Sequence, residues 1–178
     1  LVPFTPSVPV FPVFLDLPLL TGNEVEHAPH LAATATPWPG SVAAYASLAG
    51  GAYALNRILP ASAVIGVTET ALYGATHGVF ERGSALRIKV FGGGLASATD
   101  AQLLAGANAI AIGDGTSDVW EVLQFRDAVL VAEDTWEVSH RLRGQLGTDA
   151  LIPPDWPMGS VVVVNTMPVT VPGDSFSS

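Results

Sequence analysis

Hydrophobic and polar positions alternate with a period of two along much of this chain, which indicates β-strands rather than helices. The longest alternation covers residues 136–143, where four predicted core-facing side chains are interleaved with four polar ones. The core-facing set is Trp136, Val138, His140 and Leu142, and the polar set is Glu137, Ser139, Arg141 and Arg143. This pattern predicts a strand with one buried and one solvent-exposed face.

The preceding segment predicts the partner of that strand. Leu123 and Phe125 are expected to face inward, with Gln124 and Arg126 outward, in a strand that continues to Val131. Residues 132–134 then turn the chain. The two strands together predict an antiparallel ribbon.

Other segments repeat the same signals. Residues 41–48 and 53–59 alternate around a Gly-Gly pair that suits a tight turn, so they predict a hairpin. Further strands are expected at 63–72, 86–91 and 108–112. The four valines at 161–164 suit a strand that is buried on both faces.

A single short helix is predicted at about 99–106. Thr99 and Gln102 have the spacing of a capping box, in which each side chain bonds the backbone N–H of the other residue. Gly106 can end the helix in the left-handed conformation. Helical periodicity of this length amounts to about two turns.

The first twenty residues predict an extended Pro-rich arm. Prolines recur at every third position from Pro3 to Pro12, the period of a polyproline II helix. Val8, Phe11 and Phe14 are then candidates for docking on a partner, and the alternative is a stiff segment folded over its own domain. We assign 1–36 to this arm and a loop, 37–172 to a β-rich domain and 173–178 to a tail.

These elements predict an all-β fold. Many short strands with Gly- and Pro-containing turns and one short helix are typical of an antiparallel sandwich or a partly open barrel. The order of the strands is left open by the sequence.

Composition narrows the functional classes. Hydrophobic residues make up 49% of the 178 residues and charged residues only 13%, so we expect part of the surface to be covered by other protein, with a well-filled core as the alternative. A net charge of −9 argues against binding to nucleic-acid phosphates.

The sequence has no cysteine, which excludes disulfides and thiol catalysis. Because it begins at Leu1 and shows no signal peptide, we expect a piece of a longer polypeptide.

The candidates for chemistry are weak. Residues 173–176 (GDSF) resemble part of a lipase motif but lie at the end of the chain. His27 and His30, or an acidic turn with Asp114, Asp118 and Glu121, would each need further converging ligands to hold a metal. We therefore expect no catalytic residue, no metal and no cofactor.

Two tryptophans could instead bind a ligand. Trp38 and Trp156 lie in Pro-flanked loops and are the candidates for exposed rings on which a sugar could stack. The alternative is that each ring packs against its own prolines.

Several segments together resemble a known family. They are LDLPLLTGNEVEHAPHLA (15–32), TPWPGSVAAYAS (36–47), GANAIAIGDGTSDVWEVLQF (106–125), TWEVSHRLRGQLGT (135–148) and PPDWPMGSVVVV (153–164). They are similar to the C-terminal part of the large baseplate protein of gene transfer agents and related siphophage tails. Such tail-tip, or host-specificity, proteins carry a glycoside-hydrolase-like TIM barrel further upstream, so no catalytic residue is transferred.

The resemblance implies a structural module of a phage-like tail baseplate, in a virion or particle assembled in the bacterial cytoplasm. Its implied partners are other copies of itself, as a homotrimer, and tail proteins such as the hub. The alternative it leaves open is a receptor- or glycan-binding domain at the tail tip.

Overall fold

A computed structural model describes residues 8–18, 29–47, 51–116, 118–164 and 167–168. Strands account for 47% of the chain and helices for 8%, which confirms the all-β prediction. The first strands are β1 (Phe11–Leu15), β2 (His30–Thr34), β3 (Val42–Ala46), β4 (Ala54–Leu59), β5 (Val64–Thr68), β6 (Leu72–Tyr73) and β7 (Phe80–Glu81). They are followed by β8 (Leu86–Val90), β9 (Ala109–Gly113), β10 (Trp120–Ala132), β11 (Thr135–Leu142), β12 (Asp155–Trp156), β13 (Val161–Val164) and β14 (Met167–Pro168).

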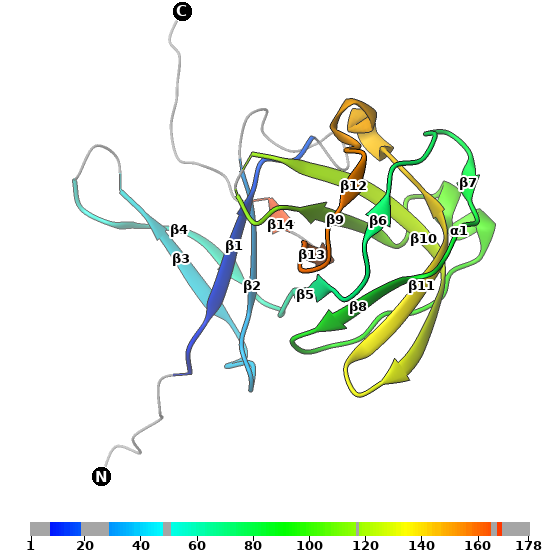
Figure 1. Ribbon diagram of the computed structural model, residues 1–178. Coiled ribbons are helices and arrows are strands. Elements are labelled where there is room, and N and C mark those ends of the chain that lie inside the picture. Colours follow the sequence, from blue (N-terminus) through cyan, green and yellow to red (C-terminus); the bar gives the residue numbers. More distant parts are fainter. Residues whose placement is uncertain (1–7, 19–28, 48–50, 117, 165–166, 169–178) are drawn as a thin grey trace, which may run out of the picture.

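Six of these strands form a closed antiparallel barrel (Figure 1). Their order is β10-β9-β13-β5-β8-β11, and β11 returns to pair with β10. Strand β10 can join both ends because it is 13 residues long. Its first part, Trp120–Gln124, pairs with β9, and the part from Gln124 onward pairs with β11. The predicted antiparallel ribbon of residues 123–143 is therefore confirmed, and its β10–β11 pairing is the one that closes the barrel.

The barrel interior is filled by alternate residues of all six strands, together with three residues from outside the barrel wall, Leu72, Leu95 and Trp156. The buried interior residues are Val64, Leu72, Leu86, Ile88, Val90, Leu95, Ile110, Ile112, Leu123, Phe125, Val138, Trp156, Val162 and Val164. Strand β8 shows the period most clearly, because Leu86, Ile88 and Val90 are buried while Arg87 and Lys89 are exposed. Interior packing of this kind is the main source of stability of a small barrel.

A second core lies on the outer face of the barrel, where the N-terminal strands cover it. Leu15, Leu17 and Ala32 pack there against Ile65, Ala111, Trp120, Val122 and Val163. Strands β13, β5 and β9 are consequently buried on both faces. For β13 this confirms the prediction from the valine run.

The N-terminal segment differs in part from the prediction. Residues 11–15 form β1 and pair with β2, which lies inside the stretch predicted to be a loop. That loop prediction is wrong for His30–Thr34, because a strand there satisfies its backbone through β1 and buries its side chains against the barrel. Pro12 is tolerated since β1 is an edge strand. For residues 11–17 the structure shows the alternative of folding over their own domain.

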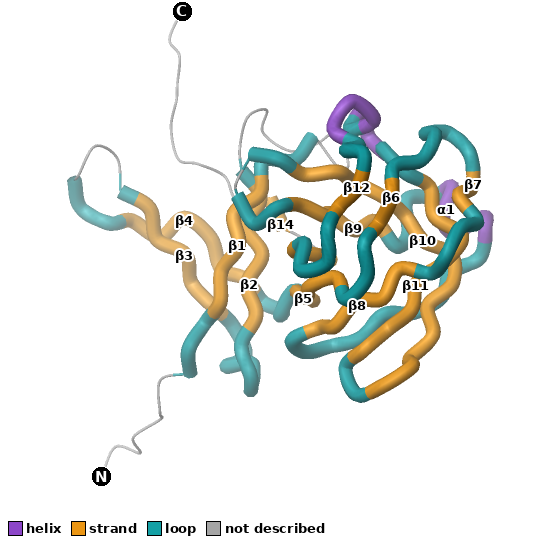
Figure 2. The backbone as a smooth tube through the Cα atoms, viewed as in Figure 1, coloured by secondary structure: helices purple, strands orange, loops and turns teal. Residues whose placement is uncertain are grey.

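The predicted hairpin at 41–59 is confirmed as β3 and β4, which form a separate two-stranded sheet. Its base packs through Leu59 on Leu31 and Ala33. The rest of the hairpin extends away from the barrel (Figure 2). The glycine turn at Gly50 lies outside the described residues.

Among the described residues the single α-helix is α1 (Asp100–Leu104), which confirms the predicted position and capping box. The Gln102 N–H donates to Thr99 Oγ1 over 3.3 Å, and the Thr99 N–H donates to Gln102 Oε1 over 2.8 Å. The helix covers Gln124, whose Nε2 donates to the Leu103 carbonyl over 2.8 Å. Gln124 thus faces outward from the barrel, as predicted, but it is buried because a helix from elsewhere in the chain covers it.

Gly66 tests the tight pairing of β5 with β8. Gly66 lies opposite Val90, and a Cβ at this position would overlap the backbone carbonyl oxygen of Lys89. We expect Gly66→Ala to lower the free energy of unfolding by about 1–3 kcal/mol, because two strands of a closed barrel cannot separate without cost. Urea denaturation followed by tryptophan fluorescence measures the change. An unchanged midpoint would contradict this close approach.

Candidate functional site

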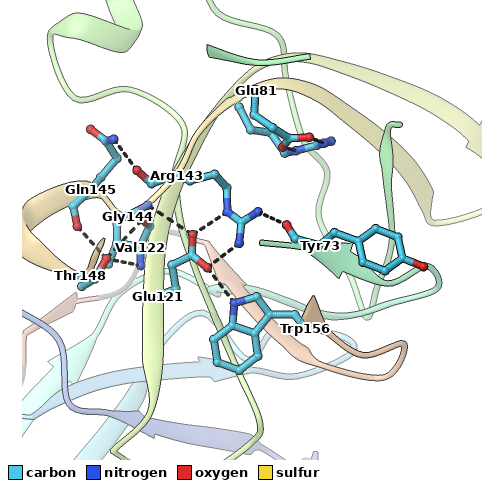
Figure 3. A network of polar contacts seen from close by, with 10 residues as sticks. Tyr73, Glu81, Glu121, Val122, Arg143, Gly144, Gln145, Thr148 and Trp156 are labelled. Carbon is cyan, nitrogen blue, oxygen red and sulfur yellow. Dashed lines mark hydrogen bonds and ion pairs between the residues drawn. The ribbon is translucent and has the colours of Figure 1, made fainter. Parts of the chain in front are cut away.

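The strongest concentration of polar contacts lies at one end of the barrel (Figure 3). Strands β6 and β12 pair with each other there, and their Leu72 and Trp156 belong to the interior core. Glu121 enters from β10, in phase with the inward-facing Leu123 and Phe125. Arg143 follows the end of β11. Four separate segments thus meet around one ion pair.

Glu121 and Arg143 are both fully buried, with 0% of each side chain exposed. Arg143 donates to the carboxylate from Nε over 2.6 Å and from Nη2 over 2.8 Å. Trp156 Nε1 adds a third bond of 2.7 Å, and the Gly144 N–H a fourth of 3.2 Å. Four donors occupy the lone pairs that a carboxylate offers.

The guanidinium is also anchored on its far side. Arg143 Nη1 donates to the Tyr73 carbonyl oxygen over 2.7 Å, which ties the ion pair to β6 (Figure 3). A bidentate pair with every partner satisfied is the arrangement in which a buried ion pair is tolerated. Glu121 therefore has no free oxygen for a metal or a proton transfer, and the network holds the barrel end together.

Thr148 forms further hydrogen bonds at the same end of the barrel. It lies between two short 3-10 turns, η1 (Gln145–Gly147) and η2 (Asp149–Leu151). The Val122 N–H donates to Thr148 Oγ1 over 2.9 Å, and that hydroxyl donates to the Gln145 carbonyl oxygen over 2.8 Å (Figure 3). The chain after β11 is thus fastened to the edge of β10 that β11 leaves unpaired at Val122.

A second ion pair involves Arg141, two residues before Arg143 and within β11. Arg141 is buried and donates from Nε and Nη2 to the two carboxylate oxygens of Glu81, each over 2.6 Å. The sequence predicted Arg141 and Arg143 on the outward face, and this is wrong. His140 has a positive φ of 52°, which interrupts the side-chain alternation and turns the following arginines inward.

His140 itself belongs to a half-buried charged cluster outside the core. Its Nδ1 lies 2.5 Å from Asp127 Oδ2, and Arg126 contacts the same carboxylate at 3.1 Å. Arg126 also reaches Asp100 of α1 at 3.6 Å. The hydrogen bond from Arg126, assisted by His140, holds the pKa of Asp127 below its usual range. The predicted placement of His140 on the apolar face is therefore wrong.

The two candidate stacking tryptophans are not both exposed. Trp156 is only 4% exposed and its indole N–H is bonded to Glu121, so the prediction of an exposed ring there is wrong. Trp38 is half-buried and packs against the cluster at the hairpin base. Trp156 lies in the core because β12 pairs with β6 and covers the end of the barrel.

The predicted docking residues Phe11 and Phe14 are exposed on β1, while Val8 is half-buried. Phe11 borders an open groove of about 260 Å³, which it lines with Pro9, Thr34, Ala35, Thr36 and Phe91. The groove is apolar and uncharged. It can accept a hydrophobic side chain, and the polar side chains among its lining residues are those of Thr34 and Thr36.

The metal candidates that lie within the described residues do not converge. Asp114 bonds Thr116 within its own turn, whereas Glu121 is committed to Arg143. His30 is buried in β2, and both His27 and the 173–176 motif lie outside the described residues. Within the described ranges, no group of three or more acidic or histidine side chains is arranged to hold a metal. The helices in these ranges are also too short or too polar to cross a membrane.

Sequence reasoning missed the roles of Glu121 and Arg143. For Glu121 a signal existed, since this acid is in phase with Leu123 and Phe125 and is flanked by apolar residues on both sides. For Arg143 no such signal existed, because its burial depends on the backbone conformation of His140.

Comparison with known proteins gives one family. The family described as "Rcc01698-like, C-terminal" matches residues 63–163, more than half of the chain. The matched range runs from just before β5 into β13 and so includes the barrel strands. No curated protein matches the sequence.

The buried ion pair can be tested against an exposed one. Glu121→Gln leaves Arg143 uncompensated in the interior, and we expect a loss of about 3–5 kcal/mol of unfolding free energy. The matched control is Glu137→Gln, which breaks an exposed pair with Arg87 and should cost about 1 kcal/mol or less. Denaturant unfolding measures both, and equal losses would contradict a special role for the barrel end.

The cluster around Asp127 predicts a pH dependence. Because the folded-state pKa of Asp127 is depressed, its contribution to stability is present at neutral pH and is lost as the pH falls through that pKa. We expect Asp127→Asn to cost about 1 kcal/mol or less at pH 7, since the cluster is solvent-screened. The difference from wild type should shrink below about pH 4. A difference that is the same at pH 7 and pH 3 would contradict this.

Proposed function

Because the chain belongs to the Rcc01698-like, C-terminal family, we propose that it is a structural module of a phage-like tail baseplate, in a gene transfer agent or a siphophage-type particle. The observation that carries the proposal is the exposure of large apolar side chains on two projecting β-ribbons. The module acts by packing against other proteins of the baseplate.

The first ribbon is the β3–β4 hairpin. Tyr45, Leu55 and Ile58 are 60%, 51% and 54% exposed. The second is the far end of β10–β11, where Val129 and Leu130 are 58% and 55% exposed. Exposed apolar surface of this kind is typical of sites that other proteins cover.

The resemblance of the sequence to tail-tip proteins supports the same role. Two of the similar segments, 106–125 and 135–148, lie wholly within the range matched by the family. They contain Glu121 and Arg143, which hold the barrel end. The similarity therefore covers residues on which the barrel depends.

The proposed partners are other copies of the chain, arranged as a trimer, and neighbouring tail proteins such as the hub. The proposed location is the tail baseplate of a particle that assembles in the bacterial cytoplasm. The low share of charged residues and the closed barrel both suit a structural subunit. A closed barrel has no free sheet edge in its wall on which other strands could add.

Glycan binding at the tail tip has less support. It was inferred from exposed rings at both Trp38 and Trp156, and Trp156 is buried in the ion-pair network. We therefore do not propose this pair as a sugar-stacking platform.

The proposal is tested on intact particles by electron microscopy with an antibody fragment raised against the purified chain. We expect labelling confined to the tail tip, and stronger labelling after the tip is partly disrupted, because packed surfaces then become accessible. A fragment against the capsid serves as the control for particle integrity. Failure to label intact and disrupted particles, with the fragment still binding the purified chain, would overturn the proposal.

A further inference from the structure

We propose that the β3–β4 hairpin of one copy of this chain packs against the β10–β11 ribbon end of the next copy, in a head-to-tail contact. The inference deepens the proposed structural role and rests on it for its setting in a baseplate. It names the partner as a second copy and identifies the two surfaces that meet.

The hairpin presents one apolar face that no described residue of its own chain covers. Ala43 lies opposite Ile58, and Tyr45 lies opposite Leu55, so these four side chains share a face. All four are exposed. A two-stranded ribbon is marginally stable by itself, and packing against a further surface would stabilise this one.

The ribbon end presents a second apolar surface. Ala128 and Trp136 are the last residues that pack against the barrel interior. Beyond them, Val129, Leu130 and Val131 are all exposed. Consecutive residues of a strand point to opposite faces, so the ribbon end exposes apolar side chains on both sides. The face of Leu130 continues into Trp136, whereas Val129 lies opposite Glu137, which is paired with Arg87.

Charge distinguishes the two surfaces from each other. No acidic residue occurs between Glu26 and Glu69, a stretch that includes the whole hairpin. Arg57 on β4 is paired with Ala44 on the opposite face of this thin ribbon, and it makes no ion pair with a described residue. Its charge therefore acts on a partner across the ribbon and not from within the apolar face. The ribbon end instead carries Glu133 and Asp134, both exposed.

The acidic side chains of the ribbon end are also unpaired among the described residues. Lys89 is the cation of the neighbouring strand, opposite Thr135, yet it forms no ion pair with either carboxylate. A net charge of −9 makes copies of the chain repel one another on average. Contact between the acid-free hairpin and the acidic ribbon end avoids that repulsion.

The positions of the two ribbons make the contact intermolecular. The hairpin extends from the side of the molecule that carries β1 and β2, whereas the β10–β11 ribbon end projects from the barrel at the opposite side (Figures 1 and 2). The two surfaces differ, so the contact is heterologous: the copy that contributes its hairpin keeps a free ribbon end, and the copy that contributes its ribbon end keeps a free hairpin. Such a contact repeats from copy to copy and forms a ring when the rotation closes.

Single-cysteine cross-linking tests the contact, since the sequence contains no cysteine. Leu55→Cys on the hairpin and Leu130→Cys on the ribbon end are made in separate full-length chains, mixed and oxidised. We expect the mixed dimer to exceed both homodimers several-fold. The control is Leu104→Cys, on the exposed surface of α1, which should not cross-link to either. A second pair, Tyr45→Cys with Val129→Cys, is used if either variant fails to fold.

A charge exchange tests the direction of the contact. Arg57→Glu in the Leu55→Cys chain should reduce the cross-linking yield, and adding Glu133→Lys and Asp134→Lys to the Leu130→Cys chain should restore it. Dominant hairpin–hairpin dimers, or yields no higher than with the control, would overturn the inference. This assay needs no particles, so its failure leaves the labelling of the tail tip as an independent test of the proposed function.

Discussion

The structure depends on the closure of a six-stranded barrel around a buried carboxylate. Glu121 faces the interior near one end, where an uncompensated charge would cost several kcal/mol. Arg143, Trp156 and the Gly144 amide compensate it, and they come from the chain after β11 and from β12. The same contacts hold the two-stranded cap over the barrel end, so the ion pair and the closure require each other.

This arrangement divides the chain into a rigid body and projecting ribbons. Burial on both faces of β5, β9 and β13, inside the barrel and beneath the N-terminal sheet, provides the rigid body. The β3–β4 hairpin and the end of β10–β11 extend beyond it and expose apolar side chains. A rigid body with apolar extensions is suited to contacts with neighbouring proteins, because the barrel fixes the directions in which the ribbons point.

Period-two alternation predicted the strands wherever one face is buried and the other exposed, as in β8. Alternation does not decide exposure where another part of the chain covers the second face. Gln124 is hidden by α1, and Trp156, predicted to be exposed in a loop, is drawn into the core by the pairing of β12 with β6. The loop predicted around His30 is a strand because β1 supplies its pairing. Each failure involves a partner distant in sequence.

The sequence by itself determined the strand-rich class, the 41–59 hairpin, the capped helix and the ribbon of residues 123–143, since these depend on local periodicity, turn residues and capping. Only the tertiary structure decided the order of the strands, the closure and the burial of two arginines. Arg141 and Arg143 turn inward because His140 adopts a positive φ, and the carboxylates of Glu81 and Glu121 receive them. Long-range pairing and one backbone angle, neither of which local patterning encodes, placed these charges in the interior.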